Sequence, residues 1–300
     1  MNVLLTGASG YIGGEFRAVL AQAADVNLRL LVRDKGKLKL GPGSRAEVYE
    51  GSTFDEVSLK RALSGADVAY YLVHSMAAKA DFEELDRRSA ANFLAACLDQ
   101  KVKRIIYLGG LGCKEMASRH LLSRIETGEI LSSRPDRIQT IWFRAGIIIG
   151  AGSASFKIIR NLIQKLLVMT TPRWVRSFTQ PIGIGDVVRY LEAGRHLAAA
   201  ENLVVDIGSE KMTFQEMLER AARVMGFRRW IIPVPFLSPK VSSLWLILIT
   251  PVNFRVARSL VEGLRSETIV MNHNARKYFP QIVPIPYEAA VGLALKSEKL

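Results

Sequence analysis

The sequence predicts an α/β protein in which a doubly wound parallel sheet occupies most of the chain and a smaller lobe follows it. Short, wholly apolar runs alternate with longer amphipathic runs over the first 150 residues, which is typical of a parallel sheet covered by helices on both faces. A glycine-rich loop directly follows the first apolar run. Prolines cut the last part of the chain into short pieces, as expected of a smaller and less regular lobe.

Each apolar run of the first half is expected to be a strand, and each amphipathic run a helix. The expected strands are residues 3–5, 28–32, 46–49, 68–73, 104–108 and 139–143. The expected helices are residues 12–24, 55–63, 82–98 and 120–131. Because most of these strands are separated by a helix, most connections are expected to join parallel strands, as in doubly wound sheets.

In the second half the alternation loosens. The expected elements there are a helix over 186–196, a strand over 203–207 and a helix over 213–225. Asp186 is expected to cap the first of these helices, and Thr213 with Glu216 fits a capping box on the second. The predicted domains are a nucleotide-binding domain over 1–210, with an irregular insertion near 152–180, and a smaller α-rich substrate or cap lobe over 211–300.

The strongest functional signal is the glycine-rich loop from Thr6 to Gly13, which follows a predicted strand and opens a predicted helix. In that context Gly7 permits a tight turn, Gly10 lets the backbone approach a pyrophosphate, and Gly13 lets the helix pack closely on the strand. Free N–H groups at the helix start favour phosphate. The loop therefore predicts a Rossmann-type dinucleotide site with contacts from Thr6, Gly7, Ser9, Gly10, Tyr11, Ile12 and Gly13. A glycine-rich turn without a ligand is the alternative.

The end of the second predicted strand bears on which cofactor is bound. Arg33 comes first there, followed by Asp34 and then by Lys35 and Lys37. An arginine at this place accommodates the 2′-phosphate of NADP, whereas an acidic residue accepts a hydrogen bond from the ribose 2′-hydroxyl of NAD. The position of Arg33 and the local positive charge favour NADP. NAD stays open if Asp34 faces the ribose instead.

These motifs resemble the atypical short-chain dehydrogenase/reductase group, and the resemblance covers most of the chain. Segments 31–33, 70–76, 104–110, 143–146 and 180–186 add to the match made by the glycine-rich loop. The chain is similar in particular to NmrA-like and epimerase-like NAD(P)-binding proteins and to the NAD(P)H-binding accessory subunit of respiratory complex I. The resemblance implies further cofactor contacts from the ends of the fourth, fifth and sixth strands, at Val73, His74, Gly109, Gly110, Ala145 and Gly146.

The sequence departs from that group at its catalytic pair. Active members carry a Tyr-x-x-x-Lys pair on the helix after the fifth strand, where the lysine lowers the pKa of the tyrosine. Here the same spacing holds His120 and Arg124. An arginine stays charged and cannot act as an acid at neutral pH, whereas a histidine can move a proton there. His120 and Arg124 are therefore the candidate catalytic residues. A half-exposed histidine without a role is the alternative.

Two functions follow from these residues. The first is an NADP(H)-dependent oxidoreductase or epimerase-like enzyme, expected to be a reductase of a small or apolar carbonyl or quinone substrate. The second is a non-catalytic NADP(H)-binding protein that senses redox state or stabilises a partner, which the missing Tyr/Lys pair favours. The fold alone cannot choose between them.

Composition narrows the partners. The net charge is +13, but the basic residues are scattered and no zinc-finger or RNA-recognition signature occurs, so nucleic acid is not expected. The four histidines and two cysteines lack metal-ligand spacing, so no metal site is expected either. Two cysteines cannot make a disulfide framework, and the first residues do not resemble a signal peptide. Both observations favour a cytoplasmic protein.

The most apolar stretch is residues 244–249, with basic residues on both sides. It is far shorter than the ~20 residues that a membrane span needs. We expect it to be a buried helix of the C-terminal lobe. The alternatives are a peripheral membrane contact through 240–258, or a lining for an apolar substrate such as a quinone.

Overall fold

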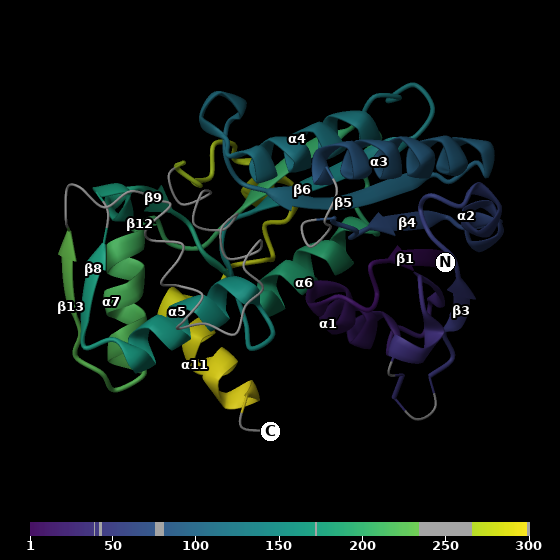
Figure 1. The fold of residues 1–300 in the computed structure, drawn as a ribbon. Coiled ribbons are helices and arrows are strands. Elements are labelled where there is room, and N and C mark those ends of the chain that lie inside the picture. Colours follow the sequence, from purple (N-terminus) through teal and green to yellow (C-terminus); the bar gives the residue numbers. More distant parts are fainter. Residues whose placement is uncertain (39, 42–43, 76–80, 172, 234–265, 299–300) are drawn as a thin grey trace.

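A seven-stranded parallel sheet forms the centre of the protein (Figure 1). The computed structural model describes residues 1–38, 40–41, 44–75, 81–171, 173–233 and 266–298. The strands are β1 (Asn2–Thr6), β2 (Asn27–Val32), β3 (Glu47–Glu50), β4 (Val68–Tyr71), β5 (Arg104–Gly110), β6 (Gln139–Ala145) and β11 (Leu203–Ile207). Their order is β11-β6-β5-β4-β1-β2-β3, and every neighbouring pair is parallel. The predicted doubly wound Rossmann-type fold is confirmed.

Helices cover both faces of this sheet, which explains why its central strands are largely apolar without alternation. On one face lie α1 (Tyr11–Leu20) and α6 (Ile184–Gly194), and on the other lie α2 (Glu56–Leu63), α3 (Phe82–Asp99) and α4 (Arg119–Leu131) (Figure 1). Successive residues of β1 serve the two layers in turn, with Leu5 in the core under α1 and α6 and Leu4 in the core under α2 to α4.

The strand order reverses between β1 and β4. From β1 the chain runs outward to β2 and β3, and it then returns to β4 on the other side of β1 and continues to β5 and β6. In such sheets the two directions of winding leave a crevice at the carboxyl ends of the central strands, where ligands bind. The glycine-rich loop leaves β1 at this point.

A third apolar cluster lies beside the sheet and joins segments that are far apart in sequence. It contains α5 (Ala154–Lys165), α7 (Phe214–Val224), α11 (Tyr287–Ser297) and the parallel pair of β8 (Val168–Thr171) and β13 (Trp230–Pro233) (Figure 1). The segment 152–180, expected to be irregular, thus contains a twelve-residue helix. Thr213 and Glu216 form the predicted capping box at the start of α7.

Short elements complete the described chain. They are the strand pairs β7 (Ile148–Ile149) with β10 (Ile182–Gly183) and β9 (Phe178–Thr179) with β12 (Met212–Thr213), the 3-10 turns η1 (Lys35–Lys37), η2 (Lys114–Met116) and η3 (Arg173–Arg176), and α10 (Asn274–Tyr278).

The predicted cap of α6 is wrong. The helix begins at Ile184 with Gly183 at its N-cap, so Asp186 lies in the first turn. The buried carboxylate of Asp186 instead accepts a hydrogen bond from the backbone N–H of Ile285 at 2.9 Å and pairs with Arg189 at 3.3 Å. It ties α6 to the segment that leads into α11, a long-range role that local sequence does not reveal.

Residues 240–258 lie outside the described residues, so the expectations for this stretch are not addressed by the structure. Within the parts of the chain that are described, no helix is long and apolar enough to cross a bilayer.

Candidate functional site

The glycine-rich loop forms a tight turn between β1 and α1. Gly7 has a φ of +71°, and a Cβ there would overlap the carbonyl of Leu72, so only glycine fits. Gly13 packs against the backbone of Gly7 in the same way. Gly10 occupies the N-cap of α1 with no side-chain cap, and the first turn of the helix carries no acidic residue. The helix N-terminus is therefore free to receive a phosphate, and the loop fits the pyrophosphate of a dinucleotide.

A cavity of about 520 Å³ opens beside this loop, at the carboxyl ends of β1, β4, β5 and β6. Its size lies in the usual range for small-molecule sites. Most of the residues predicted to form the site line it: Gly7, Gly10, Tyr11, Ile12, Gly13, Val73, His74, Gly109, Gly110, His120, Arg124, Ala145 and Gly146. Strand ends that are far apart in sequence are thus brought together, as the parallel sheet requires.

Three predicted site residues lie outside this lining. Thr6 is buried, and its hydroxyl donates to the carbonyl of Tyr70 at 2.8 Å and accepts from the N–H of Leu72 at 3.3 Å. It therefore fixes the end of β4 against β1. Ser9 and Arg33 are exposed, Ser9 within the loop and Arg33 directly after β2.

The two residues that bear on the choice of cofactor differ in their contacts. Both carboxylate oxygens of Asp34 are engaged within its own loop, Oδ1 by the N–H of Gly36 at 2.9 Å and Oδ2 by Lys37 Nζ at 3.2 Å. Lys37 and the N–H of Gly36 hold the pKa of Asp34 below its usual value. The guanidinium of Arg33 makes no hydrogen bond or ion pair with the described part of the chain, so it is the group available to a ligand.

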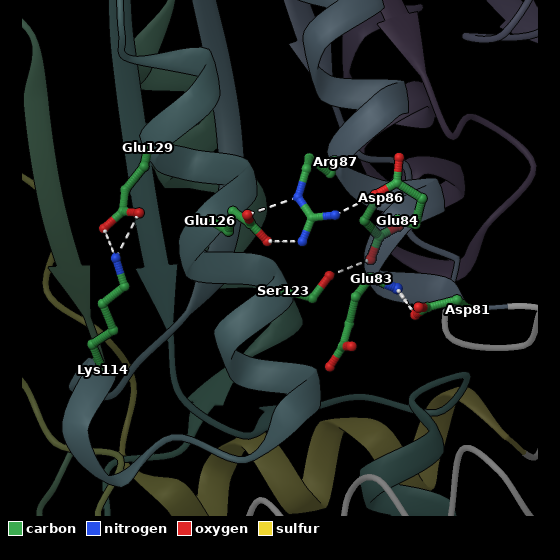
Figure 2. A network of polar contacts seen from close by, with 9 residues as sticks. All are labelled: Asp81, Glu83, Glu84, Asp86, Arg87, Lys114, Ser123, Glu126 and Glu129. Atoms are coloured by element: carbon green, nitrogen blue, oxygen red, sulfur yellow. Dashed lines mark hydrogen bonds and ion pairs between the residues drawn. The ribbon is translucent and has the colours of Figure 1, made fainter.

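His120 belongs to a chain of hydrogen bonds that starts at a buried carboxylate. Nδ1 of His120 lies 3.1 Å from Nε2 of His74, and Nδ1 of His74 lies 3.0 Å from Oδ2 of Asp86. Asp86 is 3% exposed and accepts two more hydrogen bonds, from the hydroxyl of Ser123 and the N–H of Ser75, both at 2.9 Å. Figure 2 shows Ser123 of α4 directed at Asp86 of α3. The cavity is thereby connected to a carboxylate beneath its wall.

These contacts shift the pKa values of all three groups. Burial lowers the pKa of His120 to about 2, and the neighbouring His74 and Arg124 act in the same direction. Burial also lowers the pKa of His74, although Asp86 opposes that effect. Burial would raise the pKa of Asp86, but hydrogen bonds from His74, Ser75 and Ser123 outweigh it and lower the pKa. At neutral pH the chain is therefore a carboxylate with two neutral imidazoles.

Arg124 lies on the same wall of the cavity. Nη2 of Arg124 donates to the carbonyl of Leu108 at 2.5 Å, and the backbone carbonyl of Arg124 accepts from the hydroxyl of Tyr107 at 2.9 Å. These two bonds anchor α4 on the end of β5. The Nε of Arg124 is buried and has no hydrogen-bond partner among the described residues. A buried donor without a partner is costly, so this N–H is suited to a hydroxyl or an anionic oxygen of a bound ligand.

Ion pairs hold α3 against α4 and so fix the wall that carries His120. Arg87 of α3 donates to both carboxylate oxygens of Glu126 of α4 and also pairs with Glu84 (Figure 2). Arg119 at the start of α4 pairs with Glu83 in the first turn of α3. The hydrogen bond between Ser123 and Asp86 is therefore one of several links between these two helices.

Several residues of the site carried no recognisable signal in the sequence. Asp86 and Ser123 are unremarkable members of two amphipathic helices, and only the packing of α3 on α4 reveals their contact. Isoleucines and a phenylalanine form the apolar side of the cavity, most of them from the third cluster: Ile147, Ile148, Ile158, Ile159 and Phe214. Thr268, from the far end of the chain, also lines the cavity. A distant segment that covers a site cannot be located from local patterns.

Comparison with known proteins bears on the cofactor. Residues 7–133 match the sequence model of a family described as NAD(P)H-binding. This part of the chain is an NAD(P)H-binding domain. The match covers the glycine-rich loop, His74, Asp86, His120 and Arg124, and it confirms the predicted class of cofactor. No curated protein matches the chain in sequence.

Solved structures share the fold of this domain and of the remaining chain. Triphenylmethane reductase of Citrobacter sp., complexed with NADP(H), superposes with a TM-score of 0.76 at 17% identity, over 97% of this chain and 99% of its own. UDP-glucose 4-epimerase of Thermotoga maritima, with UDP-glucose, gives 0.74 at 16% identity over 100% and 99%. A nucleoside-diphosphate-sugar epimerase of Staphylococcus aureus gives 0.76 at 15% identity over 97% and 100%. The chain thus shares its fold with reductases and epimerases.

The described residues contain no group of three or more His, Cys, Asp or Glu side chains placed to hold a metal ion.

Proposed function

We propose that this protein is an NADP(H)-dependent oxidoreductase that acts on a small or apolar carbonyl or quinone substrate. The observation that carries the proposal is that one cavity contains both the glycine-rich loop and a histidine linked to a buried carboxylate. A bound dinucleotide supplies the hydride chemistry, and the protein needs to position the substrate and move a proton. The loop at Gly10 and the chain ending at His120 meet those two needs.

The lining of the cavity supports an apolar substrate. Isoleucine and phenylalanine side chains form one wall, and none of the described residues that line the cavity carries a carboxylate. The polar groups that reach the cavity are hydroxyls, the two histidines and Arg124. Such a lining disfavours a cationic substrate and suits an apolar body with one oxygen that can be hydrogen-bonded.

NADP(H) rather than NAD(H) is the proposed cofactor. Arg33 is exposed and without a partner among the described residues, whereas Asp34 is already bonded to Gly36 and Lys37. An arginine can bind a phosphate through two parallel N–H···O hydrogen bonds. Triphenylmethane reductase, which shares the fold, is known in complex with NADP(H).

The experiment that tests this proposal is NADPH oxidation with a panel of aldehydes, ketones and quinones. With the aldehydes and ketones, NADPH deuterated at C4 should transfer its deuterium to the carbonyl carbon of the product, which separates hydride transfer from background oxidation. Turnover well above buffer, lost in His120→Gln but retained in His196→Gln, would support an oxidoreductase. A protein that binds NADPH tightly and turns over none of these substrates would contradict it.

That second outcome would favour a non-catalytic NADP(H)-binding protein that senses redox state or stabilises a partner. The observation on its side is that His120 and Arg124 stand where active relatives carry the Tyr/Lys pair, and that the pKa of His120 is lowered to about 2. His120 is therefore not a protonated acid at neutral pH.

A further inference from the structure

The hydrogen-bonded chain behind the cavity determines which nitrogen of each histidine carries a proton. Asp86 accepts from the N–H of Ser75 through Oδ1 and from the hydroxyl of Ser123 through Oδ2. These donors, with His74, hold the pKa of Asp86 below its usual value, so it is a carboxylate. A carboxylate only accepts hydrogen bonds. The contact of 3.0 Å between Oδ2 and His74 is therefore donated by Nδ1 of the histidine.

The position of the proton on His74 in turn determines its position on His120. A neutral imidazole carries one N–H, so His74, which donates through Nδ1, has an unprotonated Nε2. That nitrogen lies 3.1 Å from Nδ1 of His120, which must then be the donor. Nε2 of His120 is left with a lone pair. His120 lines the cavity, and its Nε2 makes no hydrogen bond with any residue that the structure describes.

We propose that His74 and Asp86 are positioning residues that hold His120 with an unprotonated Nε2 facing the cavity, where it is the base for a substrate hydroxyl. This rests on the proposed oxidoreductase function and deepens it, because it names the substrate group that the resting site takes. That group is the hydroxyl of an alcohol or hydroquinone. A carbonyl or quinone is reduced when the chain carries one additional proton.

An alcohol gives one proton to the protein and one hydride to the bound cofactor. Its O–H bond breaks and the proton goes to Nε2 of His120, while the carbon releases a hydride to NADP⁺ and the electron pair of the O–H bond forms the C=O bond. His120 passes its Nδ1 proton to Nε2 of His74. His74 becomes an imidazolium beside the carboxylate of Asp86, and the additional proton then leaves to solvent. Reduction of a carbonyl follows the same steps in reverse.

The charged groups around the two rings fit this transfer. Asp86 of α3 stabilises an imidazolium at His74, and Arg124 of α4 disfavours it. Tyr71 of β4 and Tyr107 of β5 lie near Asp86. Their hydroxyls stay neutral because burial raises their pKa, that of Tyr107 to about 12. The ion pair of Glu83 with Arg119 lies at the adjacent ends of α3 and α4. Among the described residues, the carboxylate of Asp86 therefore stabilises the additional proton on His74, and the guanidinium of Arg124 destabilises it.

Nitrogen NMR tests the tautomers without any substrate. In protein labelled with ¹⁵N-histidine, long-range ¹H–¹⁵N correlations at pH 7 should show both His74 and His120 as neutral Nδ1–H tautomers, with and without NADP⁺. The signals are assigned from His74→Gln and His120→Gln, and His196 and His273 complete the set of four histidines. A wild-type spectrum in which His120 carries its proton on Nε2 would overturn the proposal.

Asp86→Asn tests whether the carboxylate sets these tautomers. The amide of the variant can donate where Oδ2 accepted, so His74 should change to the Nε2–H tautomer and His120 should follow. Glu84→Gln is the matched control, since Glu84 lies on the same helix but pairs with Arg87, and it should leave both tautomers unchanged. An unchanged His120 in folded Asp86→Asn would contradict the proposal. If that variant does not fold, the wild-type spectrum still decides.

Kinetics separates this inference from the proposed function. With a substrate found in the panel, Asp86→Asn should lower kcat by about 10²–10⁴-fold while KM and the Kd for NADP⁺ change little. Alcohol oxidation should rise with pH and carbonyl reduction should fall. Equal loss in KM and kcat, or an unchanged pH profile, would mean that Asp86 has only a structural role. If no substrate is turned over, the proposed function fails, while the NMR result still decides the tautomers.

Discussion

Replacing Arg33 with alanine is expected to remove most of the preference of the protein for NADP(H) over NAD(H). The cofactors differ only in the 2′-phosphate, which carries up to two negative charges. Arg33 follows β2 directly, is exposed, and has no partner among the described residues that a phosphate would need to displace. NAD(H) lacks the phosphate, so its affinity should change little.

The size of the effect follows from the contact. A hydrogen bond to a charged group contributes about 1.5–3 kcal/mol, and a guanidinium can make two such bonds to one phosphate. Exposure at the rim pulls the net contribution towards the lower end. Since about 1.4 kcal/mol is a tenfold change in affinity, NADP(H) should bind at least about tenfold more tightly than NAD(H). Arg33→Ala should reduce that ratio to near one.

Competition titrations of both cofactors against wild type and variants measure this ratio. Arg137→Ala is the control, because Arg137 is also exposed but precedes β6, which lies on the other side of β1 in the sheet, and its loss changes the net charge equally. The preference should also weaken with added salt. Equal affinities in the wild type, or a preference for NAD(H), would mean that Asp34 gives up its contacts with Gly36 and Lys37 to hold the ribose, and the reasoning would be refuted.

Three further predictions concern the loop, the buried histidine and the apolar stretch near the C-terminus. Gly10→Val should abolish NADPH binding in calorimetry with the fold retained, because the valine side chain would occupy the space of the phosphate. Gly14→Ala should bind NADPH normally, because its added Cβ meets nothing within 4 Å. An unchanged Kd in Gly10→Val would disprove that the pyrophosphate lies at this loop. In the cofactor-free protein, unfolded His120 takes up a proton near pH 6.5 but folded His120 does not until about pH 2. The free energy of unfolding should therefore fall by up to about 1.4 kcal/mol per pH unit below 6.5, and His120→Gln, unlike His196→Gln, should flatten that slope. If residues 240–258 contact membranes, the protein should co-sediment with anionic vesicles at low salt and be released by added salt; no sedimentation at low salt would exclude the contact.

The centre of the sheet is predictable from the sequence because its strands are short apolar runs buried on both faces, whereas the edge strand β3 has exposed glutamates at both ends. Val68–Tyr71 is an example of such a central strand, with all four residues buried. Ends are less predictable than centres. The fifth strand runs two residues past the predicted Leu108, because Gly109 and Gly110 pair with Arg144 and Ala145 although glycine has little strand propensity. A Cβ at Gly109 would overlap the ring of Trp142, so close packing decides that residue.

The site is predictable to the extent that its residues share a local motif. The glycine-rich loop, Arg33 and the spacing of His120 and Arg124 are all local. The contact of Asp86 with Ser123 is not, because it arises only when α3 packs against α4, and neither residue has a neighbour in sequence that indicates it. The same holds for Asp186, whose long-range bond to Ile285 explains why it does not serve as the expected cap.

His120 and Arg124 have the spacing of the Tyr/Lys pair found in the short-chain dehydrogenase/reductase group that the sequence resembles. In a Tyr/Lys pair a cation favours the deprotonated form of the acid. Here the cation of Arg124 is directed at the carbonyl of Leu108, and the group bonded to His120 is a histidine anchored on a carboxylate. The anion of Asp86 raises the proton affinity of the chain, while burial and Arg124 lower it. In the proposed reaction, a proton taken from a substrate would thereby be stabilised on His74 but not retained, as a group that both accepts and returns a proton requires.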